Sequence, residues 1–80
     1  MISYIKFSAD WCGPCKILAE TLSKLTLPPI ESVNIDEDNG LVEKYKVRGI
    51  PTLIKLENGE EVDRLVGTVT LVELANFLEV

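Results

Sequence analysis

The two cysteines of this chain lie three residues apart, in the segment Trp11-Cys12-Gly13-Pro14-Cys15-Lys16. This segment follows a β-like run and opens a helical pattern, so both thiols should lie at the start of a helix. Thiolates attack disulfides, and the free N–H groups and positive dipole end of a helix N-terminus stabilise a sulfur anion. Cys12 is therefore the predicted nucleophile, and we expect it to be accessible to solvent. Cys15, one turn later and more buried, can close a small ring on the same sulfur and is the predicted resolving thiol.

Two other uses of the cysteine pair fit the sequence less well. A bridge between residues this close removes little loop entropy, roughly 2 kcal/mol in the chain-entropy model, which disfavours a purely structural disulfide. A closed tetrahedral zinc site needs four Cys or His ligands. The chain has two cysteines and no histidine, so only a dimer could complete a zinc or iron–sulfur site. We therefore expect no metal and no cofactor other than a redox-active disulfide between Cys12 and Cys15.

Length and composition limit the classes of protein to consider. Eighty residues, 46% of them hydrophobic, predict a single domain over residues 1–80 with one modest core. A net charge of −5 without a basic stripe argues against nucleic acid or an anionic membrane as a partner. The apolar stretches are short, and no charged segment precedes an apolar one at the start, which argues against secretion and membrane insertion. We expect a cytoplasmic protein, where a cysteine pair is more often catalytic than structural.

The hydrophobic pattern predicts alternating strands and helices in the first half of the chain. Residues 2–7 and 30–35 are rich in β-branched and aromatic types and are expected to be strands. Between them, a helix should begin near Pro14, which is favoured in a first turn, and continue through Leu25. Proline cannot continue a helix, so this helix must end before Pro28.

The acidic turn Asp36-Glu37-Asp38-Asn39-Gly40 superficially suggests a calcium-binding loop. An EF-hand loop needs glycine at its sixth position and a bidentate acid at its twelfth, but here those positions are Leu41 and Val47. The turn is therefore predicted to be solvated, with its acids at the N-terminus of a short helix. Leu41, Val42 and Tyr45 should lie on one side of that helix.

The second half of the chain predicts a hairpin followed by a helix. Residues 52–56 and 61–66 are expected to be strands joined at Asn58-Gly59, a dipeptide that fits a type I′ turn. The segment Thr70-Leu71-Val72-Glu73 matches a capping box at the start of the last helix. The apolar stripe of that helix is expected to comprise Leu71, Leu74, Ala75 and Leu78.

The order of these elements predicts their arrangement. A strand–helix–strand unit implies a right-handed parallel crossover, and the hairpin then adds antiparallel strands to the same sheet. The expected fold is therefore α/β, with a four-stranded mixed sheet and helices on both of its faces.

Five segments, taken together, resemble the thioredoxin family in their order and cover nearly the whole chain. They are Trp11–Lys16, Asn34–Asp36, Arg48–Thr52, Asn58–Glu60 and Val66–Gly67. The resemblance implies a thioredoxin-like fold with sheet order 2-1-3-4 and three helices. It also implies a dithiol–disulfide oxidoreductase in which Cys12 attacks a substrate disulfide and Cys15 resolves the mixed disulfide.

The resemblance further implies the surroundings of the cysteines. The Ile50–Pro51 peptide bond should be cis and should pack against the cysteine pair. An extended client peptide would bind in a small apolar groove with exposed backbone, by strand-like hydrogen bonds that read little sequence. The family's groove corresponds to Trp11, Gly13, Pro14, Ile50, Pro51, Val66 and Gly67.

The chain also departs from the family pattern. Members usually begin with an extra strand and helix for which this sequence has no room, so it resembles a trimmed member of glutaredoxin-like size. Lys6 stands where the family has a buried aspartate, Ser32 where it has a lysine, and Glu20 where a proline kinks the helix. Proton transfer would then go through water, or Lys6 would stabilise the Cys15 thiolate, unless Lys6 reaches solvent. Lys6 and Lys16 are the candidate modulators of thiol pKa.

The leading functional hypothesis is a small protein that reduces protein disulfides as a monomer. Its electron donor would be thioredoxin reductase, an NADPH-dependent flavoenzyme, or a similar protein, and ribonucleotide reductase is a client by family analogy. A glutaredoxin-like reductase that uses glutathione is an alternative, but the acidic chain offers few cations for the two carboxylates of glutathione. A non-catalytic binding subunit is the other alternative, against which the two cysteines at a helix N-terminus argue.

Overall fold

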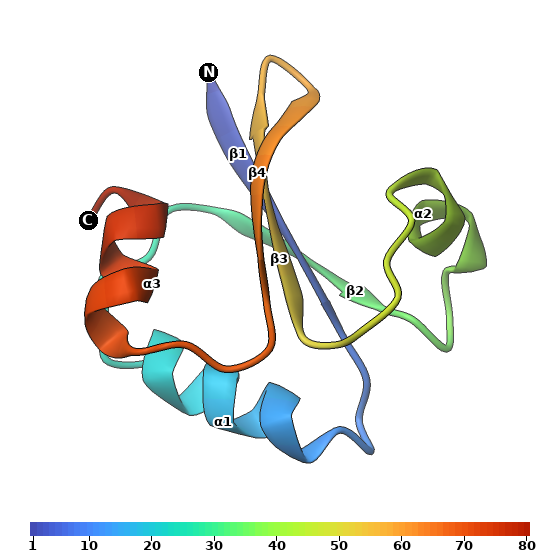
Figure 1. Cartoon of the computed structure of the whole chain (residues 1–80), viewed down its shortest axis with the longest axis horizontal. Helices are drawn as coiled ribbons and strands as arrows, with labels where there is room; N and C mark the ends of the chain where they lie inside the picture. Colours follow the sequence, from blue (N-terminus) through green and yellow to red (C-terminus); the bar gives the residue numbers. More distant parts are fainter.

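The computed structural model describes residues 1–80 and contains four strands and three helices (Figure 1). The strands are β1 (Ile2–Ser8), β2 (Ile30–Asn34), β3 (Thr52–Glu57) and β4 (Glu60–Val66). The helices are α1 (Gly13–Leu22), α2 (Asn39–Lys44) and α3 (Leu71–Leu78). The sheet has the order β2-β1-β3-β4, with β2 parallel to β1 and the other two pairs antiparallel. The predicted thioredoxin-like α/β fold, its strand order and its three helices are thus confirmed.

The helices cover the two faces of the sheet unequally. Figure 1 shows α1 and α3 on one side of the strands and α2 on the other. Successive side chains of a strand point to opposite faces, so Tyr4 faces α1 and α3, whereas Ile5 faces α2. No helix is both long enough and apolar enough to cross a membrane.

Two apolar clusters fill the interior on either side of the sheet. The cluster under α1 and α3 comprises Tyr4, Leu18, Leu22, Leu53, Leu74, Phe77 and Leu78. The cluster on the α2 face comprises Ile5, Phe7, Val33, Ile54 and Leu56. Leu41, Val42 and Tyr45 pack against the second cluster while remaining partly exposed, so their predicted common side is confirmed.

Helix α1 ends nearly one turn earlier than its apolar spacing predicts. The Lys24 amide donates to the Thr21 carbonyl at 3.2 Å, and the Leu25 amide donates to the Leu22 carbonyl at 3.0 Å. These i→i−3 backbone bonds tighten the chain into a 3₁₀-like turn, a common way for a helix to end. The Ser23 hydroxyl also donates to the Glu20 carbonyl, at 2.6 Å. The prediction that the helix includes Leu25 was therefore wrong, although Leu25 still packs against the core.

The buried stripe of α3 differs from the predicted one. Leu74, Phe77 and Leu78 are buried, whereas Leu71 is 41% exposed. Their i, i+3, i+4 spacing is that of one helix face, and Leu71 lies in the open first turn after the Thr70 cap. The Thr70 hydroxyl accepts from the Glu73 amide at 3.1 Å, as predicted for the cap. Phe77 was missed by the sequence-based prediction.

The hairpin between β3 and β4 has the predicted turn. Asn58 and Gly59 have φ angles of 53° and 87°, and two successive positive values are the signature of a type I′ turn. The pairing of the two strands is interrupted by a bulge, because Lys55 pairs with Asp63 but Leu56 pairs with Glu61. Val62 is therefore an extra residue in β4, a feature that the alternating sequence pattern did not predict.

Candidate redox site

The two cysteines form a disulfide at the N-terminus of α1. Cys12 is the N-cap residue, with extended backbone angles, and Pro14 lies in the first turn. The Cys15 amide donates a hydrogen bond to Cys12 Sγ at 3.1 Å. The N-cap sulfur thus occupies the position that a serine or aspartate oxygen takes at other helix ends, facing free N–H groups.

Both half-cystines are buried in this disulfide form. Cys12 is 4% exposed and Cys15 is 7% exposed, and Ala9 and Ile50 pack against them. The carbonyl oxygen of Ile50 lies 4.0 Å from Cys12 Sγ and covers it. The prediction that Cys12 is the accessible member of the pair therefore does not hold in the oxidised protein. The exposed residues at the site are its neighbours Trp11, which is 67% exposed, Gly13 and Pro14.

Trp11 is oriented by Asp36, which lies in the turn just after β2. Its indole Nε1–H donates to a carboxylate oxygen of Asp36 at 2.8 Å. Asp36 is itself held in place, because its backbone amide donates a hydrogen bond to the side-chain oxygen of Asn34 at 2.9 Å. The large exposed ring therefore has a defined position beside the disulfide. The sequence places Asp36 in an acidic turn, but only the parallel pairing of β1 with β2 brings it to Trp11.

The loop before β3 forms the other wall of the site. The Ile50–Pro51 bond is cis, as the family resemblance implies. Pro51 is fully buried, and its carbonyl accepts a hydrogen bond from the Gly67 amide at 2.8 Å. Val66, the residue before Gly67, is 57% exposed. The structure therefore brings Ile50, Pro51, Val66 and Gly67 together. Pro51 is buried beneath this wall and is not part of its exposed surface.

A cavity of about 220 Å³ lies between β1 and α1, behind the disulfide. Its wall is formed by Lys6, Ser8, Ala9, Asp10, Cys15, Lys16 and Ala19. Lys6 is on the α1 side of the sheet, so both candidate cations line the same cavity as Cys15. Asp10 adds one negative charge to this wall. No group of three or more His, Cys, Asp or Glu side chains is placed to hold a metal ion.

Comparison with known proteins identifies relatives of the whole fold. The thioredoxin family model matches residues 2–80. A thioredoxin of Chlamydia caviae is 48% identical over 67 residues, which cover 79% of this chain and 66% of that protein. A thioredoxin of Staphylococcus epidermidis is 37% identical in an alignment that covers 98% of this chain and 80% of that protein. The chain thus spans just under two thirds of the first relative and four fifths of the second.

Solved structures agree with the sequence comparison. A mutant thioredoxin from Halobacterium salinarum superposes with a TM-score of 0.83 at 37% identity, covering 98% of this chain and 72% of that one. The protein Trxlp from Edwardsiella tarda superposes with a TM-score of 0.86 at 30% identity, covering 96% of this chain and 81% of that one. This chain therefore belongs to the thioredoxin family, and the Cys12–Cys15 disulfide at the start of α1 makes it a thiol–disulfide oxidoreductase of that family.

Proposed function

We propose that this chain, residues 1–80 acting as a monomeric domain, reduces disulfides in client proteins. In the reduced form, the Cys12 thiolate attacks one sulfur of a client disulfide, forms a mixed disulfide and releases the other client sulfur as a thiolate. The Cys15 thiolate then attacks Cys12 Sγ, which closes the Cys12–Cys15 disulfide and releases the second client sulfur. Two electrons pass to the client, and its two thiolates take up the two protons that the cysteines lost.

The observation that carries this proposal is the N-cap position of Cys12. The Cys15 amide points at Cys12 Sγ from 3.1 Å, and the other free N–H groups of the first turn lie at the same end of α1. These donors and the helix dipole stabilise a negative charge on the sulfur, which favours both attack by Cys12 and its departure during resolution. A purely structural disulfide would not require this position.

A client peptide would bind in the groove beside the disulfide. Trp11, Gly13 and Pro14 are exposed on one side, and Val66 is exposed on the other, with Ile50 and Gly67 between them partly exposed. The backbone near Ile50 and Gly67 suits an extended peptide, because main-chain hydrogen bonds read little sequence. Cys12 is nearly covered in the oxidised form, so the proposal requires that reduction and client binding expose its sulfur.

The experiment that tests the assignment of roles is a mixed-disulfide trap. Cys15→Ser should accumulate a covalent adduct with insulin through Cys12, because attack proceeds but resolution does not. Dithiothreitol should release the adduct. The matched control is Cys12→Ser, which should form little adduct. More abundant adducts with Cys12→Ser than with Cys15→Ser would contradict the assignment.

A second assay separates the proposed function from its alternatives. The purified protein should be reduced by NADPH with thioredoxin reductase and then reduce insulin, whereas glutathione with glutathione reductase should support little turnover. The reverse preference would favour a glutaredoxin-like reductase, and inactivity with both donors would favour a non-catalytic subunit. By family analogy, we place the protein in the cytoplasm with ribonucleotide reductase as a client, which reduction of that enzyme's disulfide would test.

Lys6 and Lys16 are proposed to favour the thiolate of Cys15. Both line the cavity that contains Cys15, and a nearby cation stabilises a thiolate whereas an anion destabilises it. Stabilising the thiolate favours the dithiol state, which makes the protein a stronger oxidant. Lys6→Met should therefore lower the reduction potential measured against glutathione redox buffers, and Lys6→Asp should lower it further. Equal potentials for both variants and the wild type would mean that Lys6 is directed to solvent.

A further inference from the structure

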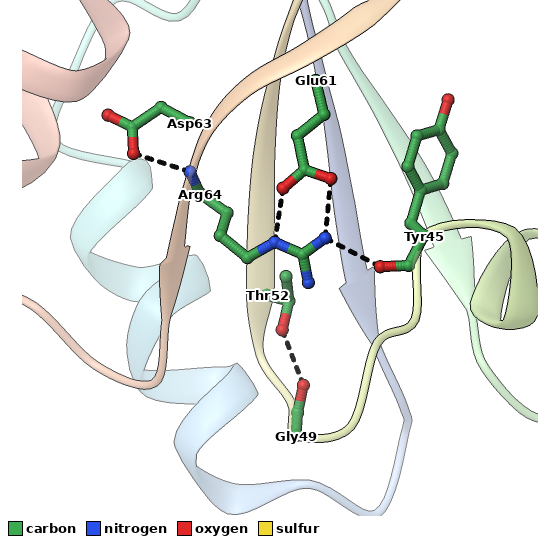
Figure 2. Close-up of polar contacts among 6 residues, drawn as sticks. All are labelled: Tyr45, Gly49, Thr52, Glu61, Asp63 and Arg64. Atoms are coloured by element: carbon green, nitrogen blue, oxygen red, sulfur yellow. Dashed lines mark hydrogen bonds and ion pairs between the residues drawn. The ribbon is translucent and has the colours of Figure 1, made fainter.

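The segment that brings Ile50 and Pro51 to the disulfide is tied to the edge strand of the sheet. Arg64 of β4 donates from Nη2 to the carbonyl oxygen of Tyr45 at 2.7 Å. Figure 2 shows the guanidinium lying between this carbonyl and the carboxylate of Glu61. Tyr45 is the C-cap residue of α2, and the last carbonyls of a helix lack partners within it. Arg64 therefore gives a hydrogen-bond partner to a carbonyl at the C-terminus of α2, where the loop that leads to Ile50 starts.

The bulge in β4 explains how Glu61 can hold Arg64. Residues three apart in a regular strand point to opposite faces of the sheet. Because Val62 is an extra residue, Arg64 pairs with Ile54 and Glu61 pairs with Leu56, two residues that both face α2. Bulges commonly redirect side chains in this way. Arg64 and Glu61 consequently share the face on which the loop lies.

The geometry of the pair leaves Arg64 charged and oriented. Its Nε and Nη2 each donate to one oxygen of the Glu61 carboxylate, with Nη2–Oε1 at 2.7 Å. This two-point contact fixes the plane of the guanidinium. The hydrogen bond from Arg64 lowers the pKa of the Glu61 carboxyl, and the same bond raises the pKa of the Arg64 guanidinium. Both groups therefore keep their charges around neutral pH.

The far end of the same loop has its own anchor. The Thr52 hydroxyl donates to the carbonyl oxygen of Gly49 at 2.6 Å, as Figure 2 also shows. Between the two anchors, Lys46 and Arg48 are exposed and Lys46 has a φ of 53°. The two polar bonds therefore add to the packing of Val47 and Ile50, the two residues of this loop that lie against the α2-face cluster. The carbonyl oxygen of Ile50 lies 4.0 Å from Cys12 Sγ.

We infer that Arg64 is a positioning residue for client binding: with Glu61 it holds the Tyr45 carbonyl, and so keeps the backbone of Ile50 where an extended client peptide can pair with it beside Cys12. The inference rests on the proposed reduction of protein disulfides. It assigns a role in the reaction to a residue that touches neither the cysteines nor the client. A surface ion pair without this role would leave client binding unchanged.

The test compares a protein client with a small disulfide. The pre-reduced protein is oxidised in a single turnover by insulin, or by 5,5′-dithiobis(2-nitrobenzoic acid), and the reaction is followed by fluorescence of Trp11, the only tryptophan. Arg64→Met keeps the long apolar stem but removes the donors. It should raise the half-saturating insulin concentration about fivefold, which corresponds to about 1 kcal/mol, the usual net contribution of one hydrogen bond. The limiting rate and the rate with the small disulfide should stay within about twofold of wild type.

Two controls separate positioning from general effects of charge. Arg64→Lys should recover part of the loss, because an ammonium can still donate to Tyr45 but cannot match both carboxylate oxygens. Lys24→Met removes one exposed cation remote from the loop and should behave as wild type. An unchanged half-saturating concentration in Arg64→Met, or an equal loss with both disulfides, would overturn the inference.

A further measurement does not depend on activity. Backbone ¹⁵N relaxation at Val47, Gly49 and Ile50 should show lower order in Arg64→Met than in wild type or Lys24→Met. Unchanged order would overturn the inference even if the proposed function were correct. Failure of the proposed function gives a different result, because the wild-type protein itself would then not be oxidised by insulin.

Discussion

The two faces of the sheet are built in different ways. On the α1 and α3 face, the helices supply five of the seven buried residues, namely Leu18, Leu22, Leu74, Phe77 and Leu78. On the α2 face, all five buried residues come from the strands, and α2 itself has no buried residue. Apolar burial therefore holds α1 and the disulfide in place, whereas it contributes much less to the position of α2 and the loop that follows.

On the α2 face, hydrogen bonds supplement the smaller apolar burial. The bond from Arg64 to Tyr45 and the bond from Thr52 to Gly49 both act on the loop that leads to Ile50. Segments with few buried apolar contacts are the ones that open most easily. In the loop that leads to Ile50, these hydrogen bonds thus add to the packing of Val47 and Ile50 against the sheet.

Truncation of one leucine on each face of the sheet should reveal this difference most strongly. Leu74→Ala removes a fully buried side chain under α3 and should lower the free energy of unfolding by about 3 kcal/mol. Leu41→Ala removes a half-exposed side chain on α2 and should cost about 1 kcal/mol. Urea unfolding of the disulfide form measures both values. Similar losses at the two positions would contradict the comparison.

Loss of the Trp11 anchor should affect activity more than stability. Asp36→Ala removes the acceptor of the indole N–H, and the unanchored ring should slow insulin reduction about threefold while costing less than about 1 kcal/mol of stability. Asp36→Asn keeps a side-chain oxygen and should retain most of the activity. The matched control is Glu37→Ala, an exposed acid next in the chain. A loss of stability without a loss of rate would show that the anchor supports the fold alone.

Much of the fold followed from the sequence because its strongest signals are local. Alternation and helical spacing depend on neighbouring residues, so the order of seven elements and the Asn58-Gly59 turn were predicted correctly. The end of α1 at Leu22 was missed, because i→i−3 backbone bonds end the helix before any proline does. Phe77 was missed because the stripe was aligned on Leu71, which lies in the exposed first turn.

The polar contacts around the site could not be predicted in the same way. Trp11 and Asp36 are 25 residues apart and meet only through the parallel pairing of two strands. Arg64 and Glu61 have the wrong spacing for a strand pair, and only the bulge at Val62 brings them to one face. Cys12 packs against Ile50, which lies 38 residues away in a loop on the other side of the site. Each of these contacts depends on tertiary geometry rather than on local pattern.

Alkaline pH should act on the α1 and α3 face through Tyr4. The phenol lies in the core and donates to the Phe77 carbonyl at 3.3 Å. Burial raises the pKa of Tyr4, and the charge of Glu79 adds to this effect. The folded state therefore disfavours the phenolate, so the contribution of Tyr4 is complete below the unfolded pKa near 10 and is lost as the pH rises through the higher folded value.

Tyr4→Phe tests this contribution in the disulfide form, where no thiol titrates. The variant should lose about 1 kcal/mol at pH 7 with the hydrogen bond. Its stability should then fall less steeply than that of wild type above pH 10, as measured by urea unfolding. Thr70→Ala, which removes the cap of α3 but no titrating group, is the control and should leave the alkaline slope as in wild type. Equal slopes for Tyr4→Phe and wild type would show that Tyr4 does not contribute.

Acidic pH should lower the stability of the α2 face through Glu61, and this effect should be weaker than that of Tyr4 at alkaline pH. The hydrogen bond from Arg64 lowers the pKa of this carboxyl in the folded protein, so its contribution is complete above the unfolded value of about 4.3 and is lost as the pH falls through the lower folded value. Glu61→Gln should cost about 0.5 kcal/mol at pH 7 because the pair is partly exposed, with the side chain of each partner at 30%. That difference from wild type should shrink as the pH falls below the unfolded value of about 4.3. In the Arg64→Met background, the same Glu61→Gln substitution should not reproduce this pattern, because the hydrogen bond that lowers the pKa of Glu61 is absent. If it did, the acid response would reflect net charge on β4, and the α2 face would not depend on the Arg64–Glu61 pair for its stability.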